Sequence, residues 1–212
     1  MMENNNVKGL PDMAAKIVSV IFYPLLIPLY GLLVVFFAPT LFWYIPSKAK
    51  LLLFLIFLFD NFLVPMLLMP FFRYRNMVSS WMPGNIAERT IPLMTVSLWY
   101  AITSFILFRL QIPVFFKAYS YSLTMVSVAL LAMNKWWNIS AYGSAAGTVL
   151  AMILALSIDM SVSIPIYLAA ASIIAAVILS ARLKQNTHSP REIYIGFFTG
   201  LSITAVVMLL LQ

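Results

Sequence analysis

The sequence contains no cysteine, one histidine and only six acidic residues among its 212 residues. The absence of cysteine excludes disulfides, thiolate metal sites and thiol nucleophiles. So few histidines and carboxylates argue against a metal site built by the protein itself. Any chemistry of the chain must therefore use a small set of polar side chains, which makes the position of each one informative.

Charge is also scarce. Charged residues make up 9% of the chain and hydrophobic residues 63%, and the mean hydropathy is +0.99. These values exclude an ordinary soluble domain and predict an all-α integral membrane protein in a lipid bilayer. Long continuous apolar runs argue against a β-barrel, whose strands alternate apolar and polar residues. We interpret the net charge of +7 as loop cations beside lipid headgroups, and not as the mark of a nucleic-acid partner.

A helix that spans a bilayer needs about 20 apolar residues, and the sequence predicts one transmembrane domain, residues 1–212, with about seven such helices. The expected spans cover roughly 14–37, 50–72, 92–110, 114–133, 141–158, 164–183 and 193–211. The first lacks the small-residue cleavage site of a signal peptide, so we expect it to be retained. Prolines inside the first two spans predict kinks, because proline has no backbone N–H group.

Seven consecutive spans place every second connection on the same side of the membrane. Three polar connections, within 73–91, 135–143 and 184–192, therefore share one side with the N-terminus. That side holds nine of the 13 lysines and arginines, and the other side holds four, at Lys48, Lys50, Arg109 and Lys117. The positive-inside rule then predicts that the N-terminal side is cytoplasmic.

The last polar connection carries the single histidine, His188, between Arg182 and Glu192. Ser189-Pro190-Arg191-Glu192 has the form of a capping box with proline at the first helical position, so His188 is expected just before the last span. A plainer alternative is that Glu192 only caps the helix, Arg182 reaches lipid headgroups and His188 is an exposed loop residue.

The other two connections offer groups that bind anions. Ser140 lies at the start of the fifth span, where free backbone N–H groups and the helix dipole favour an anion, and Tyr142 follows it. Arg89 lies near the end of the first connection, just before the third span. The plainer alternatives are a helix cap for Ser140 and an interfacial anchor for Arg89. The pairs Gly143–Gly147 and Gly196–Gly200 have the spacing of close helix packing, and we interpret both as structural.

Together the three connections resemble the type 2 phosphatidic acid phosphatase superfamily over roughly residues 80–200. The Arg-x5-His-x3-Asp motif of that family corresponds to Arg182-x5-His188-x3-Glu192, with both spacings kept. Its Ser-Gly-His motif corresponds to Ser140-Ala141-Tyr142. Its Lys-x6-Arg-Pro motif corresponds to Arg89 near Pro92, with Met82 at the position of the lysine. The resemblance implies a helical bundle in a bacterial cytoplasmic membrane that acts on a lipid phosphate or a polyprenyl diphosphate.

The resemblance also implies a covalent mechanism that needs neither a metal nor an organic cofactor. His188 would attack phosphorus and form a phosphohistidine, and Glu192 would orient the imidazole and favour its charged form. Arg89, Arg182 and the Ser140 hydroxyl would hold the phosphoryl oxygens.

Tyr142 stands where the family has the histidine that protonates the leaving group, and tyrosine, with a pKa of about 10, is a poorly matched acid near neutral pH. Because phosphate leaves more easily than a lipid alkoxide, we expect lipid diphosphates to be cleaved faster than monoesters. Two alternatives remain. One is a catalytically impaired member of this family that binds lipid phosphates. The other is a small transporter in which Asp60, inside the second span, binds a proton or cation.

Overall fold

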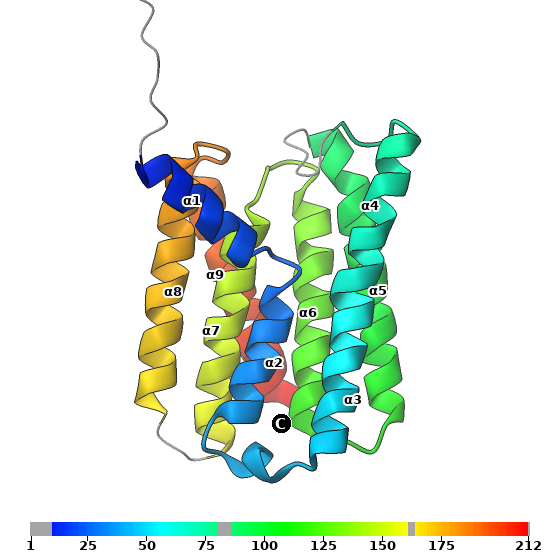
Figure 1. Cartoon of the computed structure of the whole chain (residues 1–212), viewed down its shortest axis with the longest axis vertical. Helices are drawn as coiled ribbons and strands as arrows, with labels where there is room; N and C mark the ends of the chain where they lie inside the picture. The colour runs from blue at the N-terminus through cyan, green and yellow to red at the C-terminus, as the bar shows by residue number, and fades with distance from the viewer. Residues whose placement is uncertain (1–9, 80–85, 161–163, 212) are drawn as a thin grey trace, which may run out of the picture.

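The computed structural model describes residues 10–79, 86–160 and 164–211, which are helical and contain no strand. Six helical segments of this part are long and apolar enough to cross a membrane. The first, Ser47–Tyr74, joins α3 (Ser47–Leu58), the π-helical turn η2 (Phe59–Leu63) and α4 (Val64–Tyr74). The others are α5 (Ile86–Arg109), α6 (Val114–Met133), α7 (Ala141–Asp159), α8 (Pro165–Lys184) and α9 (Pro190–Leu211). Successive spans run in opposite directions (Figure 1), and the chain is an all-α integral membrane protein. Met82 lies outside the described residues.

Residues 14–37, expected to form the first of seven spans, instead form parts of two shorter helices. They are α1 (Leu10–Ile21) and α2 (Ile27–Phe37), and a four-residue 3₁₀ turn, η1 (Leu41–Tyr44), follows. The break falls around Pro24, because proline disfavours helical geometry in the residue before it and supplies no N–H group. The 11 residues of α2 rise about 16 Å, roughly half of the hydrocarbon core. The described residues therefore contain six long spans and one half-length apolar helix.

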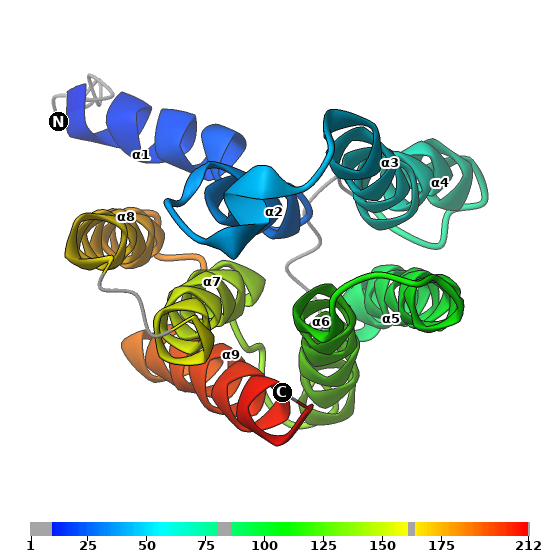
Figure 2. The same cartoon turned by 90° about the horizontal axis from the view of Figure 1, so that it is seen from below.

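Helix α1 lies obliquely across one end of the bundle, against α8 (Figures 1 and 2). Its inner side carries the small buried residues Ala15 and Ser19, and its outer side exposes Met13, Ile17 and Val20. An apolar stripe on the outside of a helix at the end of a membrane bundle is typical of a helix that lies in the lipid interface.

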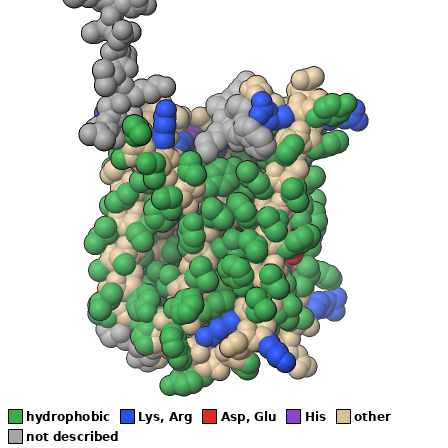
Figure 3. Space-filling view, viewed as in Figure 1, with side chains coloured by type: hydrophobic (Ala, Val, Ile, Leu, Met, Phe, Trp, Pro, Cys, Tyr) green, Lys and Arg blue, Asp and Glu red, His purple; other side chains and the backbone are tan. Residues whose placement is uncertain are grey.

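The face of the bundle seen in Figure 3 is covered by hydrophobic side chains over the middle of its height. Lysines and arginines gather at its two ends (Figure 3). This distribution matches the layers of a bilayer, with an apolar core between two polar interfaces.

Helices α7 and α9 pack backbone to backbone through the two glycine pairs. A Cβ atom on Gly143 would lie 2.6 Å from the Ile193 carbonyl oxygen, and one on Gly196 would lie 2.5 Å from the Ser140 carbonyl oxygen. Cβ atoms on Gly147 and Gly200 would meet the backbones of Phe197 and Ser144. The structural interpretation of both pairs is confirmed. This contact holds the start of α7 directly beside the first turn of α9.

Candidate functional site

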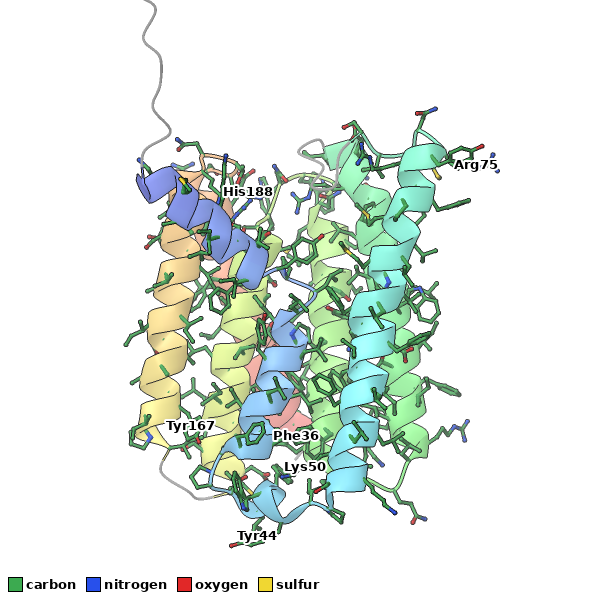
Figure 4. The ribbon with its side chains drawn as sticks, viewed as in Figure 1. Phe36, Tyr44, Lys50, Arg75, Tyr167 and His188 are labelled. Carbon is green, nitrogen blue, oxygen red and sulfur yellow. The ribbon has the colours of Figure 1, made fainter. Side chains whose placement is uncertain are left out.

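The described residues of the three polar connections lie at one end of the bundle, the end that α1 also covers (Figure 1). Figure 4 shows His188 at this end and Tyr44 and Lys50 at the opposite end. The segment 138–140, just before α7, joins the connections. Arg89 of α5 donates a hydrogen bond through Nη2 to the Ile139 carbonyl at 2.7 Å. The imidazole of His188 lies 2.7 Å from the Asn138 carbonyl oxygen through Nδ1.

Glu192 forms the expected capping box at the start of α9. Its Oε2 atom accepts a hydrogen bond from the Ser189 N–H group at 2.8 Å, and the Ser189 hydroxyl accepts one from the Glu192 N–H group at 3.4 Å. Pro190 is the first residue of the helix. The second carboxylate oxygen accepts from the Asn138 N–H group at 3.2 Å. Glu192 therefore connects the α9 cap to segment 138–140.

The imidazole of His188 is oriented by a main-chain carbonyl and not by the Glu192 carboxylate. The closest His188–Glu192 approach, from Nδ1 to Oε2, is 4.0 Å, which is too long for a hydrogen bond. A carbonyl oxygen can only accept, so Nδ1 carries the proton that it shares with Asn138. In the neutral ring this leaves a lone pair on Nε2, the nitrogen that a nucleophilic histidine needs.

Burial lowers the pKa of the His188 imidazole below its usual value of 6.5. The positive charges of Arg89 and Arg182 lower this pKa further. The hydrogen bond to the Asn138 carbonyl and the negative charge of Glu192 raise it, but each by less than burial lowers it. The lowered pKa means that the ring is neutral at neutral pH, with the Nε2 lone pair available.

Arg182 is almost fully buried and is held from three sides. Its Nη1 donates to the Gln185 side-chain oxygen at 2.7 Å, and its Nη2 donates to the Thr187 hydroxyl at 2.6 Å. The guanidinium lies over the Tyr142 ring, with Cζ 4.3 Å from the ring centroid. Gln185 also donates to the Ala15 carbonyl at 2.7 Å, so the position of Arg182 is tied to α1.

Two expected site residues have other partners in the structure. The Tyr142 hydroxyl donates to the Ser19 carbonyl of α1 at 3.0 Å, so this proton is shared with a backbone oxygen. The Ser140 side chain is fully buried and accepts from the Gly143 N–H group at 3.3 Å, as a helix cap. Tyr142 lines the cavity described next, whereas Ser140 does not.

A cavity of about 310 Å³ extends from this end into the bundle. Its polar end is formed by Arg89, Asn138, Arg182, Gln185, Thr187 and His188. Its apolar walls include Leu93, Val96, Leu123, Val126 and Leu130. None of the described residues that line it is acidic. The cavity therefore fits an amphiphile with an anionic head and an apolar tail.

Two guanidinium nitrogen atoms at the polar end have no acceptor in the described part of the chain. The Nη1 atom of Arg89 and the Nε atom of Arg182 are buried and have no hydrogen-bond partner among the described residues. Buried donors on charged groups are costly when they stay unpaired. An oxyanion between these groups would supply the missing acceptors and compensate both charges.

Three features of this site were not predicted from the sequence. Gln185 and Thr187 hold Arg182, and their polarity and short spacing from it were the available signal. The Asn138 carbonyl has no such signal, since every residue has a carbonyl group. The contact of Ser19 with Tyr142 joins residues 123 positions apart, which no local pattern encodes.

No protein-family model matches the chain, and comparisons with curated proteins and with solved structures found no match.

Proposed function

We propose that the protein is a membrane phosphatase that removes phosphate from a lipid phosphate or lipid diphosphate through a phosphohistidine on His188. The observation that carries the proposal is the cavity with Arg89, Arg182 and His188 at its polar end and apolar walls beyond them. The resemblance of the three motifs to the type 2 phosphatidic acid phosphatase superfamily supports the same function from the sequence.

Lipid phosphate binding follows from charge and shape together. The buried guanidinium group of Arg182 and the half-buried one of Arg89, each with an unpaired nitrogen among the described residues, favour a multiply charged oxyanion over a neutral headgroup. The apolar walls would make no favourable contact with a fully hydrated anion, whereas they accommodate a hydrocarbon chain.

The chemistry proceeds in two displacements. The Nε2 lone pair of neutral His188 attacks phosphorus, the N–P bond forms, and the bond from phosphorus to the leaving oxygen breaks. The leaving oxygen takes a proton from water, and Arg89 and Arg182 stabilise the charge on the phosphoryl oxygens. Water then attacks phosphorus, the N–P bond breaks, phosphate is released and His188 returns to its neutral form. The bond between Nδ1 and the Asn138 carbonyl stabilises the charged ring between the two steps.

The leaving group receives little help from Tyr142 in this arrangement, because its hydroxyl proton is bonded to the Ser19 carbonyl. General-acid assistance contributes roughly 10²–10⁴-fold in rate. Without this assistance, the rate of cleavage falls much more for a lipid alkoxide leaving group than for a phosphate leaving group. The proposal therefore keeps the preference for diphosphates over monoesters.

A protein that only binds lipid phosphates would use the same arginines, and turnover distinguishes it from the phosphatase. The transporter alternative has less support. Asp60 is buried in η2 near the Thr103 hydroxyl, at 3.4 Å, and it does not line the cavity.

Phosphate release from a panel of lipid monophosphates and diphosphates tests the proposal, with purified protein in detergent. Wild type should release phosphate, and His188→Ala should reduce release to background. Arg182→Lys should lower the rate because a lysine cannot reproduce the planar fork of arginine. Lys135→Ala is the matched control, since Lys135 is an exposed cation that does not line the cavity. Activity that survives His188→Ala would contradict the covalent step.

A further inference from the structure

The wall of the cavity carries two buried hydroxyl groups that the proposed phosphatase chemistry does not use. Ser144 and Thr148 of α7 both line the cavity, and each is only 1% exposed. Neither hydroxyl oxygen has a hydrogen-bond partner among the described residues. A buried hydroxyl without a partner lowers stability, so its presence in a cavity wall needs an explanation.

Several other hydroxyls in the membrane helices of this protein form a hydrogen bond within their own helix, whereas those of Ser97 and Thr204 are also unpartnered among the described residues. Thr95 of α5 donates to the carbonyl four residues earlier, as do Ser172 of α8 and Thr199 of α9. This local bond is the usual arrangement for serine and threonine in membrane helices. Ser144 and Thr148 do not form it, although both residues line the cavity.

The two residues lie below the polar end of the cavity, on one face of α7. They are four residues apart, and the spacing of four places them on the same side of the helix. At 1.5 Å per residue they lie about 6 Å and about 12 Å along the helix axis from Ser140, toward the membrane interior. They therefore lie beyond the arginines, where a bound lipid passes from its headgroup to its hydrocarbon chain.

We propose that Ser144 and Thr148 form a hydroxyl subsite that donates hydrogen bonds to an acceptor oxygen in the bound lipid, of the kind that an ester carbonyl provides. In a phosphorylated glycerol ester the ester carbonyl lies a few bonds beyond phosphorus. A polyprenyl chain carries no acceptor there and would leave both hydroxyls unpaired. The subsite selects ester-linked lipid phosphates and diphosphates over the polyprenyl ones, and this inference rests on the proposed binding of a lipid phosphate in the same cavity.

The test compares two single-chain lipids that differ only at the linkage. The probes are oleoyl-glycerol phosphate, which is an ester, and its alkyl-ether counterpart, which has no carbonyl. Binding is measured by titration of the full-length protein in detergent, in a His188→Ala background that prevents turnover. The ester should bind about two- to tenfold more tightly than the ether, the range of a neutral hydrogen bond.

Substitution of the subsite should remove that advantage. Ser144→Ala and Thr148→Val should each weaken binding of the ester and leave binding of the ether unchanged. Thr204→Val is the matched control, because the Thr204 hydroxyl is also buried and unpartnered but does not line the cavity. Thermal unfolding of each variant reports whether the fold is intact.

Each outcome is decisive. Equal binding of ester and ether by the His188→Ala protein would show that the hydroxyls serve only a water or nothing, and would overturn the subsite while leaving the phosphatase intact. Equal weakening of both lipids in Thr148→Val would also overturn it, since this indicates altered packing. Oleoyl-glycerol without phosphate, bound as tightly as the phosphate, would overturn the proposed function instead. Failure of both phosphorylated lipids to bind would overturn both proposals.

Discussion

Histidine orientation in this site depends on one acidic residue that does not touch the ring. Glu192 binds the N–H groups of Ser189 and Asn138, and the Asn138 carbonyl binds His188. Glu192 is therefore a positioning residue that acts on the imidazole through the backbone of segment 138–140. Removing the charge of Glu192 should shift the Asn138 carbonyl while Arg89 and Arg182 keep their positions.

Glu192→Gln should lower kcat with little change in KM, because the amide can replace only part of the double acceptor role. It should also lower the free energy of unfolding by about 1 kcal/mol, the usual value of a helix cap. Steady-state kinetics and thermal unfolding measure the two effects. Arg191→Gln, an exposed change in the same helical turn, is the control. A rise in KM without a fall in kcat would contradict this role.

The acid limb of the pH–rate profile should reflect the lowered pKa of His188. The groups that act on the ring are Arg89 of α5, Arg182 of α8, Glu192 of α9 and the Asn138 carbonyl. Because the folded-state pKa lies below 6.5, the His188 imidazole stays neutral as the pH falls through 6.5. The value of kcat/KM should therefore hold there and decline only at lower pH. A decline centred above 6.5 would contradict the lowered pKa.

The same shift has a consequence for stability. Below pH 6.5 the unfolded chain binds a proton at His188 that the folded chain does not yet bind. The contribution of this group to folding is present above 6.5 and is lost as the pH falls through the folded-state pKa. Thermal unfolding of the wild type should therefore lose more stability than His188→Gln between about pH 7 and pH 5, and equal losses would contradict this.

At the residue scale, the sequence is most informative for side chains of rare types, such as the single histidine. Arg89, Arg182 and His188 were predicted to meet, and all three line one cavity. The partners of Glu192 and Tyr142 were not predicted. Their bonds go to main-chain atoms of Asn138 and Ser19, and main-chain atoms have no signature in a sequence.

Among the elements, the pair α7 and α9 carries the closest packing, and it positions the site. The Ser140 N–H group donates to the Glu192 carbonyl at 3.2 Å, next to the contact of Gly196 with Ser140. Separating these helices would move segment 138–140 away from His188. Packing in the membrane interior and geometry at the interface are therefore linked.

Gly200→Ala should destabilise the protein, although alanine is the better helix former by about 1 kcal/mol. The added Cβ would meet the Ser144 backbone, with the carbonyl carbon 2.7 Å away, and overpacking of this kind costs about 1–3 kcal/mol. Thermal unfolding in detergent and phosphate release should both decrease. Ser202→Ala, at an exposed position of the same helix, should stay within about 0.5 kcal/mol. An unchanged Gly200→Ala protein would show that α7 and α9 can separate freely.

The sequence predicted the elements well where apolar runs were long and uninterrupted. The expected spans at 114–133 and 141–158 agree with α6 and α7 within a residue at each end. The expected span at 14–37 was the exception, since hydropathy counts apolar residues and does not register the break at Pro24. The outward apolar stripe of α1 raises the hydropathy of this segment, which explains why the sequence predicts one continuous span there.

For the whole molecule, the excess of Lys and Arg at the site end predicts that this end faces the cytoplasm. The absence of cysteine allows a direct test with single cysteines at the two ends. Trp137→Cys marks the site end and Tyr44→Cys the other end, and both side chains are exposed. An impermeant thiol reagent added to intact cells should label Tyr44→Cys and not Trp137→Cys. The reverse pattern would place the site on the outer face.

The hold on His188 by a carbonyl group has an evolutionary consequence. A carboxylate partner can be lost by one substitution, whereas the carbonyl of position 138 survives every substitution there. Residue 138 can therefore be substituted as long as the backbone conformation is kept. Selection acts instead on Glu192 and on the small residues between α7 and α9. Descendants of such a protein would conserve the backbone geometry around the histidine while losing the sequence motif by which the site could be recognised.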